Sequence, residues 1–207
     1  MSLYKGFHVC LGAIVRCIFR VKVEGGENLP NEGSYIVACN HICNADPVIL
    51  AVSVKNRRQI RFMAKKELFK IPLLAQLIKA LGAFPVDRGG ADVRALKHSL
   101  KMLEGGEVVG IFPQGTRHPK VHPQGSEVRN GVGMLAKRSG AMILPACIET
   151  KNFKIIPFFR RTYVRFGTPY MPTYTLEGSD AYGEIAAEAF EKVLELINTP
   201  APEENNQ

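Results

Sequence analysis

Two side chains near the N-terminal end, His41 and Asp46, have the residue types and the spacing of an acid–base pair. On one continuous helix, residues five positions apart point about 140° away from each other, so these two can meet only if the chain turns between them. A carboxylate that accepts the Nδ1 proton of an imidazole leaves Nε2 free as a base. Such a pair could deprotonate a hydroxyl group that a substrate supplies. A polar loop histidine next to a helix-capping aspartate would give the same pattern, so the pair needs support from the rest of the chain.

A second group of residues suits the binding of a phosphate or an oxyanion. Gly115 lets the backbone come close to a ligand, Thr116 offers a hydroxyl group, and Arg117 offers a planar fork of donors. Arg88 lies directly before two glycines and has the same character. The ordinary role of a lone arginine is a surface ion pair. A phosphate-binding role for either arginine is therefore supported only by the residues beside it.

The elements that must position these residues follow from the apolar runs. Residues 35–39 are apolar, which predicts a buried strand that ends just before His41. Asp46 followed by a proline predicts a helix start, with Asp46 as the N-cap. Arg88 and Arg117 also follow predicted strands. Because ligand sites of α/β sheets lie off the carboxyl ends of the strands, we expect His41, Arg88 and Arg117 to approach one edge of the sheet.

Strands and helices alternate along the chain, which is typical of an α/β sheet with helices on both faces. We expect an α/β fold with a single-domain mixed sheet over residues 23–200, preceded by a separate helix over 1–22 and followed by a disordered polar tail over 201–207. The predicted strands lie at 35–39, 61–64, 107–112, 141–148, 161–167 and the start of 82–90, and the predicted helices begin at 47 and span 72–81, 92–104, 131–139 and 179–198.

Two of these elements carry further expectations. The helix over 72–81 is more apolar than a surface helix needs to be, so we expect it to be buried. The alternative is that it contributes to a site for an acyl chain or a membrane. Pro145 cannot donate a hydrogen bond to a neighbouring strand, so we expect its strand to lie at an edge of the sheet or to carry a bulge.

Residues 3–21 have the pattern of an amphipathic helix, with Lys5, Arg16 and Arg20 on the basic side. The segment lacks the ~20 uncharged residues that span a bilayer, and no small-residue cleavage site follows it, as one would after a signal peptide. It fits a helix lying in a membrane interface and a helix packed on its own domain equally well. The apolar face consists of Leu3, Phe7, Cys10, Leu11, Ile14, Cys17, Ile18 and Val21.

Composition narrows the class of partner. The chain has 27 Lys and Arg against 19 Asp and Glu, and the net charge of +8 suits nucleic acid, acidic headgroups, phosphorylated small molecules or an acidic carrier protein. The five cysteines are odd in number and show no disulfide-framework spacing, so we expect free thiols in a reducing cytosol and no metal site. The sequence contains no serine-hydrolase elbow, no nucleotide-binding glycine loop and no nucleic-acid-binding motif.

Four segments in a fixed order resemble the glycerolipid acyltransferase family. They are Asn40-His41-x4-Asp46, residues 82–88, residues 112–117 and residues 144–146, and the resemblance covers about residues 35–150. It implies transfer of a fatty acyl group from a thioester of acyl-carrier protein or coenzyme A to the sn-2 hydroxyl of lysophosphatidate, which gives phosphatidate. No bound cofactor is implied. The N-terminal helix is similar to the membrane-facing element of that family, which implies peripheral binding to the anionic cytoplasmic face of the cell membrane. Because no nucleic-acid-binding motif is present, we expect no nucleic-acid partner.

The resemblance also implies roles for individual residues. His41 would be the general base and Asp46 its orienting partner. The family usually has Glu where this chain has Gln114, so a negative charge is missing near the implied phosphate. Glycerol-3-phosphate or another lysolipid as acceptor, and a non-enzymatic lipid-binding module, are the alternatives. The residues implied to bind substrate are Arg88, Gln114, Gly115, Thr116, Arg117 and, as a weaker candidate, Lys65.

Overall fold

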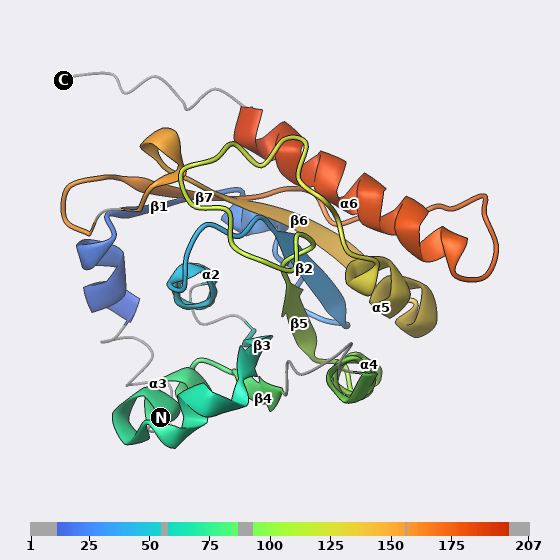
Figure 1. Cartoon of the computed structure of the whole chain (residues 1–207), viewed down its shortest axis with the longest axis horizontal. Helices are drawn as coiled ribbons and strands as arrows, with labels where there is room; N and C mark the ends of the chain where they lie inside the picture. Colours follow the sequence, from blue (N-terminus) through green and yellow to red (C-terminus); the bar gives the residue numbers. More distant parts are fainter. Residues whose placement is uncertain (1–11, 55–57, 87–92, 156, 199–207) are drawn as a thin grey trace.

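The computed structural model of the chain describes residues 12–54, 58–86, 93–155 and 157–198, which form one α/β domain built on a mixed sheet (Figure 1). Seven strands in the described part follow the order β1-β7-β6-β2-β5-β3-β4. Neighbouring strands are parallel except β6 and β7, which are antiparallel. The predicted mixed α/β sheet is confirmed. The strands are β1 (Val21–Glu24), β2 (Tyr35–Cys39), β3 (Ile60–Lys65), β4 (Phe84–Val86), β5 (Val108–Ile111), β6 (Met142–Glu149) and β7 (Thr162–Phe166).

Helices cover both faces of this sheet. One face packs against α5 and α6, with α4 beside them, and the other face packs against α2 (Figure 1). The predicted helices on both faces are therefore confirmed. The helices are α2 (Asp46–Ser53), α3 (Pro72–Ala80), α4 (Val93–Glu104), α5 (Gly131–Ser139) and α6 (Asp180–Asn198).

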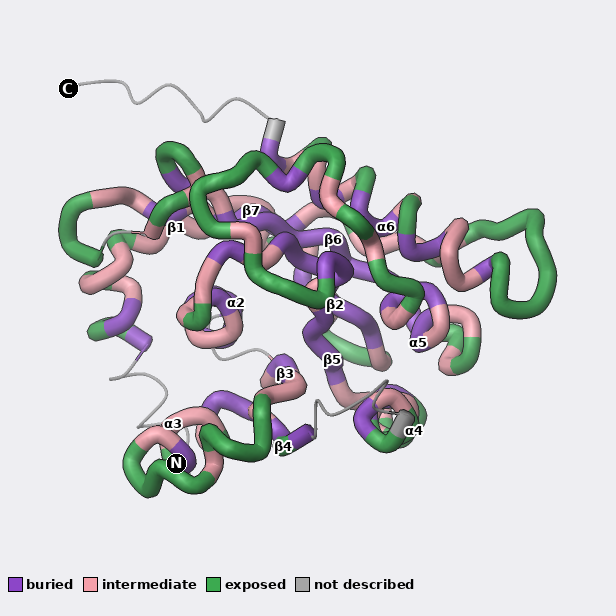
Figure 2. The backbone as a smooth tube through the Cα atoms, in the orientation of Figure 1, coloured by how far each residue is buried: buried purple, intermediate pink, exposed green. Residues whose placement is uncertain are grey.

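Strand β2 lies in the middle of the sheet between β6 and β5, and all of its side chains are buried (Figure 2). Ile36 and Ala38 face the core under α5 and α6, while Tyr35, Val37 and Cys39 face the core under α2. Burial on both faces explains why the strand is a continuous apolar run. The parallel register with β5 places the segments that follow these two strands side by side.

The expectation that the helix over 72–81 is buried is wrong. In α3 only Ala75 is buried, and Leu73 is 82% exposed. The helix lies beyond β3 and β4 at the end of the sheet, so only one side of it meets the domain (Figure 1). Leu77 makes that contact, against a small cluster formed by Val15, Ala51, Val52 and Leu81.

Pro145 does not lie in an edge strand, because β6 pairs with both β2 and β7. The alternative expectation of an irregular ladder fits better. Ala146 pairs with Phe166, and Ile143 forms a bridge with Tyr170. Between these two pairs the partner segment advances by four residues while β6 advances by three, so the partner segment contains one extra residue. The proline falls within this register shift, where a regular ladder bond is not required.

The sequence pattern also missed β1. Residues 12–18 are helical, but Arg20 adopts a left-handed backbone conformation with φ of 47°, and the chain then enters the sheet at Val21. β1 is only four residues long and pairs with β7. The expected boundary between residues 22 and 23 therefore falls inside a strand. Residues 201–207, the expected tail, lie outside the described residues.

The first part of the predicted amphipathic helix, residues 1–11, also lies outside the described residues. In the described part, Val15 is buried against α2, whereas Ile14 is 55% exposed and Cys17 is exposed. Arg16, expected on the basic outer face, instead donates from Nε to the carbonyl oxygen of Val52 at 2.9 Å. Within the described ranges, no helix combines the length and the apolar character needed to cross a bilayer.

Candidate active site

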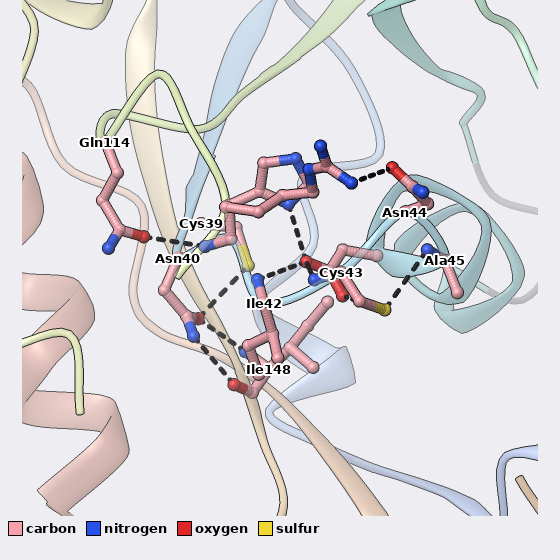
Figure 3. Close-up of polar contacts among 11 residues, drawn as sticks. Cys39, Asn40, Ile42, Cys43, Asn44, Ala45, Gln114 and Ile148 are labelled. Carbon is pink, nitrogen blue, oxygen red and sulfur yellow. Dashed lines mark hydrogen bonds and ion pairs between the residues drawn. The ribbon is translucent and has the colours of Figure 1, made fainter. Parts of the chain in front are cut away.

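The turn that follows β2 brings His41 and Asp46 into direct contact. His41 Nδ1 lies 2.7 Å from Asp46 Oδ2, and the Asp46 side chain is fully buried. The same oxygen accepts hydrogen bonds from the backbone N–H groups of Ile42 and Cys43, at 2.6 and 2.8 Å (Figure 3). Because a carboxylate only accepts, the imidazole proton belongs on Nδ1, and Nε2 is left as a base.

Asp46 reaches this position because it turns back towards the loop instead of capping α2. The N-cap of α2 is Ala45, and no side chain caps the helix. The prediction of Asp46 as the N-cap is therefore wrong, although the helix does begin here with Pro47 in its first turn. The carboxylate is already engaged by His41 and by the turn, so it is not available to the helix N–H groups.

Cys43 completes the surroundings of the carboxylate. Its Sγ donates to Asp46 Oδ1 at 3.3 Å. Burial, together with the charge of Asp46, raises the pKa of the Cys43 thiol to about 12. The thiol therefore stays protonated at neutral pH and supports Asp46, and it is a poor nucleophile although it lies two residues from His41.

The segment after β5 holds the backbone of His41. The His41 N–H donates to Gln114 Oε1 at 2.8 Å, and the His41 carbonyl accepts from the N–H of His118 at 2.8 Å. The imidazole ring stacks on Phe112, with 4.0 Å between ring centroids and 13° between the planes. The side chain of His41 is 13% exposed. The base is thus fixed at its ring, its N–H and its carbonyl, and remains reachable from outside.

Asn40 anchors the same turn from the other side of β2. Its Nδ2 donates to the carbonyl oxygen of Ile148 at 2.9 Å, and its Oδ1 accepts from the Ile148 N–H at 2.8 Å (Figure 3). The residue is 1% exposed. The amide thus joins the end of β2 to β6. Asn40 was not among the predicted site residues, although an amide side chain directly after a buried strand is a signal that could have identified it.

Arg117, predicted to bind phosphate, lies beside the His41 turn. Its Nη1 donates to Asn44 Oδ1 at 2.8 Å, which uses one of the five donors of the guanidinium group. Thr116 and Gly115 are exposed on the same loop, and Gly115 has a φ of 68°, a conformation that favours glycine. This loop and the His41 turn therefore approach one edge of the sheet, as expected for two of the three strand ends.

Of the other predicted site residues, Lys65 and Gln114 lie in the described part of the chain. Lys65 is exposed at the carboxyl end of β3, opposite Val86 of β4. Arg88 lies outside the described residues. Gln114 is 2% exposed and both ends of its amide are bonded to protein, to His41 and to Ser126.

An apolar cavity of about 240 Å³ opens beside His41. Gly110 in β5 allows it to be shaped as it is, since a Cβ there would lie 2.1 Å from the Phe62 ring. The cavity was not predicted from the sequence, although a glycine inside a buried strand is a signal that marks a close approach of another group. The lining residues are His41, Phe62, Met63, Val86, Ala95, Leu96, Gly110, Ile111, Phe112 and Gly115.

The described residues contain no group of three or more His, Cys, Asp or Glu side chains that could hold a metal ion. Cys17, Cys39, Cys43 and Cys147 are free thiols, and Cys10 lies outside the described residues. The contact of His41 with Asp46 supports acid–base chemistry at His41, beside an apolar cavity and an exposed arginine.

Comparison with known proteins gives a consistent assignment. The family model described as Acyltransferase matches residues 20–149, which include His41, Asp46 and the loop of Arg117. The 1-acyl-sn-glycerol-3-phosphate acyltransferase of Bacillus subtilis (strain 168) is 35% identical over 147 residues, which cover 71% of this chain and 71% of that protein. The protein of the same name from Streptococcus pneumoniae is 33% identical over 146 residues, or 69% of this chain and 53% of that protein.

A solved structure is similar over nearly the whole chain. The crystal structure of the 1-acyl-sn-glycerophosphate (LPA) acyltransferase PlsC from Thermotoga maritima aligns with a TM-score of 0.63 and 25% identity, covering 95% of this chain and 79% of that chain. The matched family model, the relatives and the fold agree. The chain belongs to the acyltransferase family and is an enzyme of the O-acyltransferase type that these relatives represent.

Proposed function

We propose that this enzyme transfers a fatty acyl group from the thioester of acyl-carrier protein or coenzyme A to the sn-2 hydroxyl of 1-acyl-glycerol-3-phosphate, giving phosphatidate. The observation that carries the proposal is the His41–Asp46 contact of 2.7 Å beside an apolar cavity that His41 itself lines. The names of the relatives favour this acceptor over glycerol-3-phosphate and other lysolipids.

In the proposed reaction, Nε2 of His41 takes the proton of the acceptor hydroxyl while the hydroxyl oxygen attacks the thioester carbonyl carbon. Asp46, which holds the Nδ1 proton, stabilises the imidazolium that forms. The C–S bond then breaks, and the departing thiolate takes the proton from Nε2, which restores the neutral imidazole. The acceptor hydroxyl is the nucleophile, so the scheme needs no acyl-enzyme, in keeping with the protonated Cys43 thiol.

The two substrates would occupy different parts of the site. The cavity that Phe62 and Leu96 line suits the acyl group of the donor, since most of its lining is apolar. Arg117 suits the acceptor's phosphate as a bidentate donor, with Thr116 and Gly115 beside it. Lys65, at the carboxyl end of β3, is proposed for the same phosphate, and so is Arg88, which lies outside the described residues.

We further propose that the enzyme works as a peripheral protein on the cytoplasmic face of the cell membrane, where a lysolipid acceptor resides. The exposed Ile14 and Cys17 on the helical segment, together with the net charge of +8, support docking on an anionic surface.

The test is an assay of the purified protein with a panel of acceptors and both classes of donor. Lysophosphatidate is expected to be the preferred acceptor, and His41→Ala is expected to lower turnover by ~10²–10⁴-fold while the far-ultraviolet circular dichroism is unchanged. Arg117→Lys should raise the KM for the acceptor because the ammonium group lacks the planar fork. Near wild-type turnover in a folded His41→Ala enzyme would rule out the mechanism, and preference for another acceptor would rule out the substrate.

A further inference from the structure

Gln114 lies at the start of the segment that follows β5 and is almost completely buried, at 2% exposure. Its Oε1 accepts the backbone N–H of His41 at 2.8 Å, and its Nε2 donates to Ser126 Oγ at 2.9 Å. Figure 3 shows the amide directed towards the turn that carries Asn40 and Ile42. The two polar ends of the side chain are thus engaged inside the protein.

We propose that Gln114 is a positioning residue for His41, which it holds through the backbone amide, and that it does not contact the acceptor. The inference rests on the proposed function, because it concerns the placement of the general base. It gives the glutamine a role that differs from the substrate binding expected from sequence.

The placement matters because one loop supports both parts of the proposed chemistry. The segment after β5 holds the His41 N–H through Gln114 and the His41 carbonyl through the N–H of His118. The same segment carries Arg117, which bonds to Asn44 in the His41 turn. Gln114 therefore fixes the base relative to the arginine proposed to bind phosphate. A misplacement of about 1 Å between such groups can cost ~10²-fold in rate.

The hydrogen bonds also explain how glutamine serves where the resembled family usually has glutamate. The bond to His41 requires only an acceptor, which an amide oxygen and a carboxylate oxygen both provide. At the other end, the Ser126 hydroxyl accepts from the amide and, after rotation, can donate to a carboxylate. The position therefore requires an acceptor of this length aimed at the His41 N–H, and it does not require a negative charge.

The experiment compares Gln114→Met, which keeps the length and loses both polar groups, with Gln114→Glu, which keeps the acceptor. Steady-state kinetics with a short-chain, water-soluble lysophosphatidate separate kcat from KM. Gln114→Met is expected to lower kcat about tenfold and to leave the acceptor KM within about twofold, because the base is displaced and the phosphate contacts are not. Gln114→Glu is expected to stay within about threefold of wild-type kcat.

Two further variants keep the test decisive. Ser126→Ala removes the outer partner only, and its kcat is expected to stay within about threefold of wild type. Gln114→Asn keeps the amide group on a side chain that is one methylene shorter, so the amide oxygen no longer reaches the His41 N–H. If Gln114→Met does not fold, Gln114→Asn is expected to show the same loss of kcat.

The proposal is overturned if Gln114→Met raises the acceptor KM while kcat is retained, since that outcome indicates a substrate contact. It is also overturned if Gln114→Glu loses as much kcat as Gln114→Met. Failure of the proposed function would look different, because His41→Ala would then retain turnover whatever occupies position 114.

Discussion

Arg117 donates from Nη1 to the side-chain oxygen of Asn44 at 2.8 Å, and Asn44 is three residues after His41 in the same turn. An arginine proposed to bind phosphate is thus tied to the loop of the proposed base. Free in solution, a long side chain of this kind would sample many rotamers. The contact keeps the guanidinium group near the place where the acceptor hydroxyl must lie.

Asn44→Ala should therefore raise the acceptor KM about threefold to tenfold and change kcat little, which corresponds to the ~0.5–1.5 kcal/mol of a typical hydrogen bond. The exposed Gln124, in the segment after β5 that also carries Arg117, provides the control, and Gln124→Ala should leave the KM unchanged. A KM for Asn44→Ala that equals the control value would mean that Arg117 needs no such support.

The contacts of Asp46 predict different results for two substitutions. In Asp46→Asn, one amide oxygen can still accept from the turn, so the fold should persist while kcat falls, because the imidazolium loses its compensating charge. In Asp46→Ala the N–H groups of Ile42 and Cys43 lose their acceptor, so stability should fall as well. Urea unfolding and kcat, measured on both variants, check this. Equal stability of the two variants would contradict the assigned contacts.

Asn40 is expected to contribute to the stability of the fold, whereas the nearby Asn44 is not. Asn40→Ala leaves both backbone groups of Ile148 without their side-chain partner, and it should lower the free energy of unfolding by ~2–4 kcal/mol. The exposed Asn44→Ala should change it by less than ~0.5 kcal/mol. Two equal values from denaturant titrations would show that the Asn40 bridge contributes nothing.

Adjacent residues in the helical segment test the proposed membrane docking. Ile14 is 55% exposed and Val15 is 7% exposed. Ile14→Glu should weaken binding to anionic vesicles and slow turnover on bilayer substrate, with little change in Tm and in activity on a water-soluble acceptor. Val15→Glu places a charge in the contact with α2 and should lower the Tm. Unchanged vesicle binding by a folded Ile14→Glu protein would exclude this face as the docking surface.

The raised pKa of the Cys43 thiol predicts a pH dependence of stability. Folding raises this pKa from 9.0 to about 12, so the folded state favours the protonated thiol. The resulting stabilisation is complete below pH 9 and is lost as the pH rises from there towards about 12. The stability difference between wild type and Cys43→Ser should therefore be constant from pH 6 to 8 and shift against wild type above pH 9. A constant difference up to pH 10.5 would contradict the shift.

The parts of the fold that sequence predicted correctly are those fixed by local signals. β2 and α5 have the expected ends, because an apolar run and a helix between glycines or polar residues are readable over a few positions. β1 was missed because four residues of a short strand carry little pattern. The burial of α3 was predicted wrongly because an apolar helix can face solvent when it lies beyond the edge of a sheet.

The site shows the same division. His41 and Asp46 lie five residues apart, and their contact follows from a turn that the sequence predicts. The supports of that turn join residues far apart in sequence: His41 and Gln114 are 73 positions apart, and Asn40 and Ile148 are 108 positions apart. Such contacts depend on strand order, which a single sequence does not specify. The apolar cavity was missed for the same reason.

The position of β2 between β5 and β6 has a consequence for the order of assembly. Both neighbours are made much later than β2 during synthesis, and the loop that holds His41 follows β5. A ribosome-bound chain that ends before Ser126 already carries His41 and Asp46, yet it lacks β6, the Ile148 partner of Asn40 and the Ser126 partner of Gln114. Contacts between residues so far apart in sequence form late in folding, because closing the long chain segment between them costs conformational entropy. The enzyme is therefore expected to become active only when its sheet is complete, so that an unfinished chain carries the base without the geometry that makes it one.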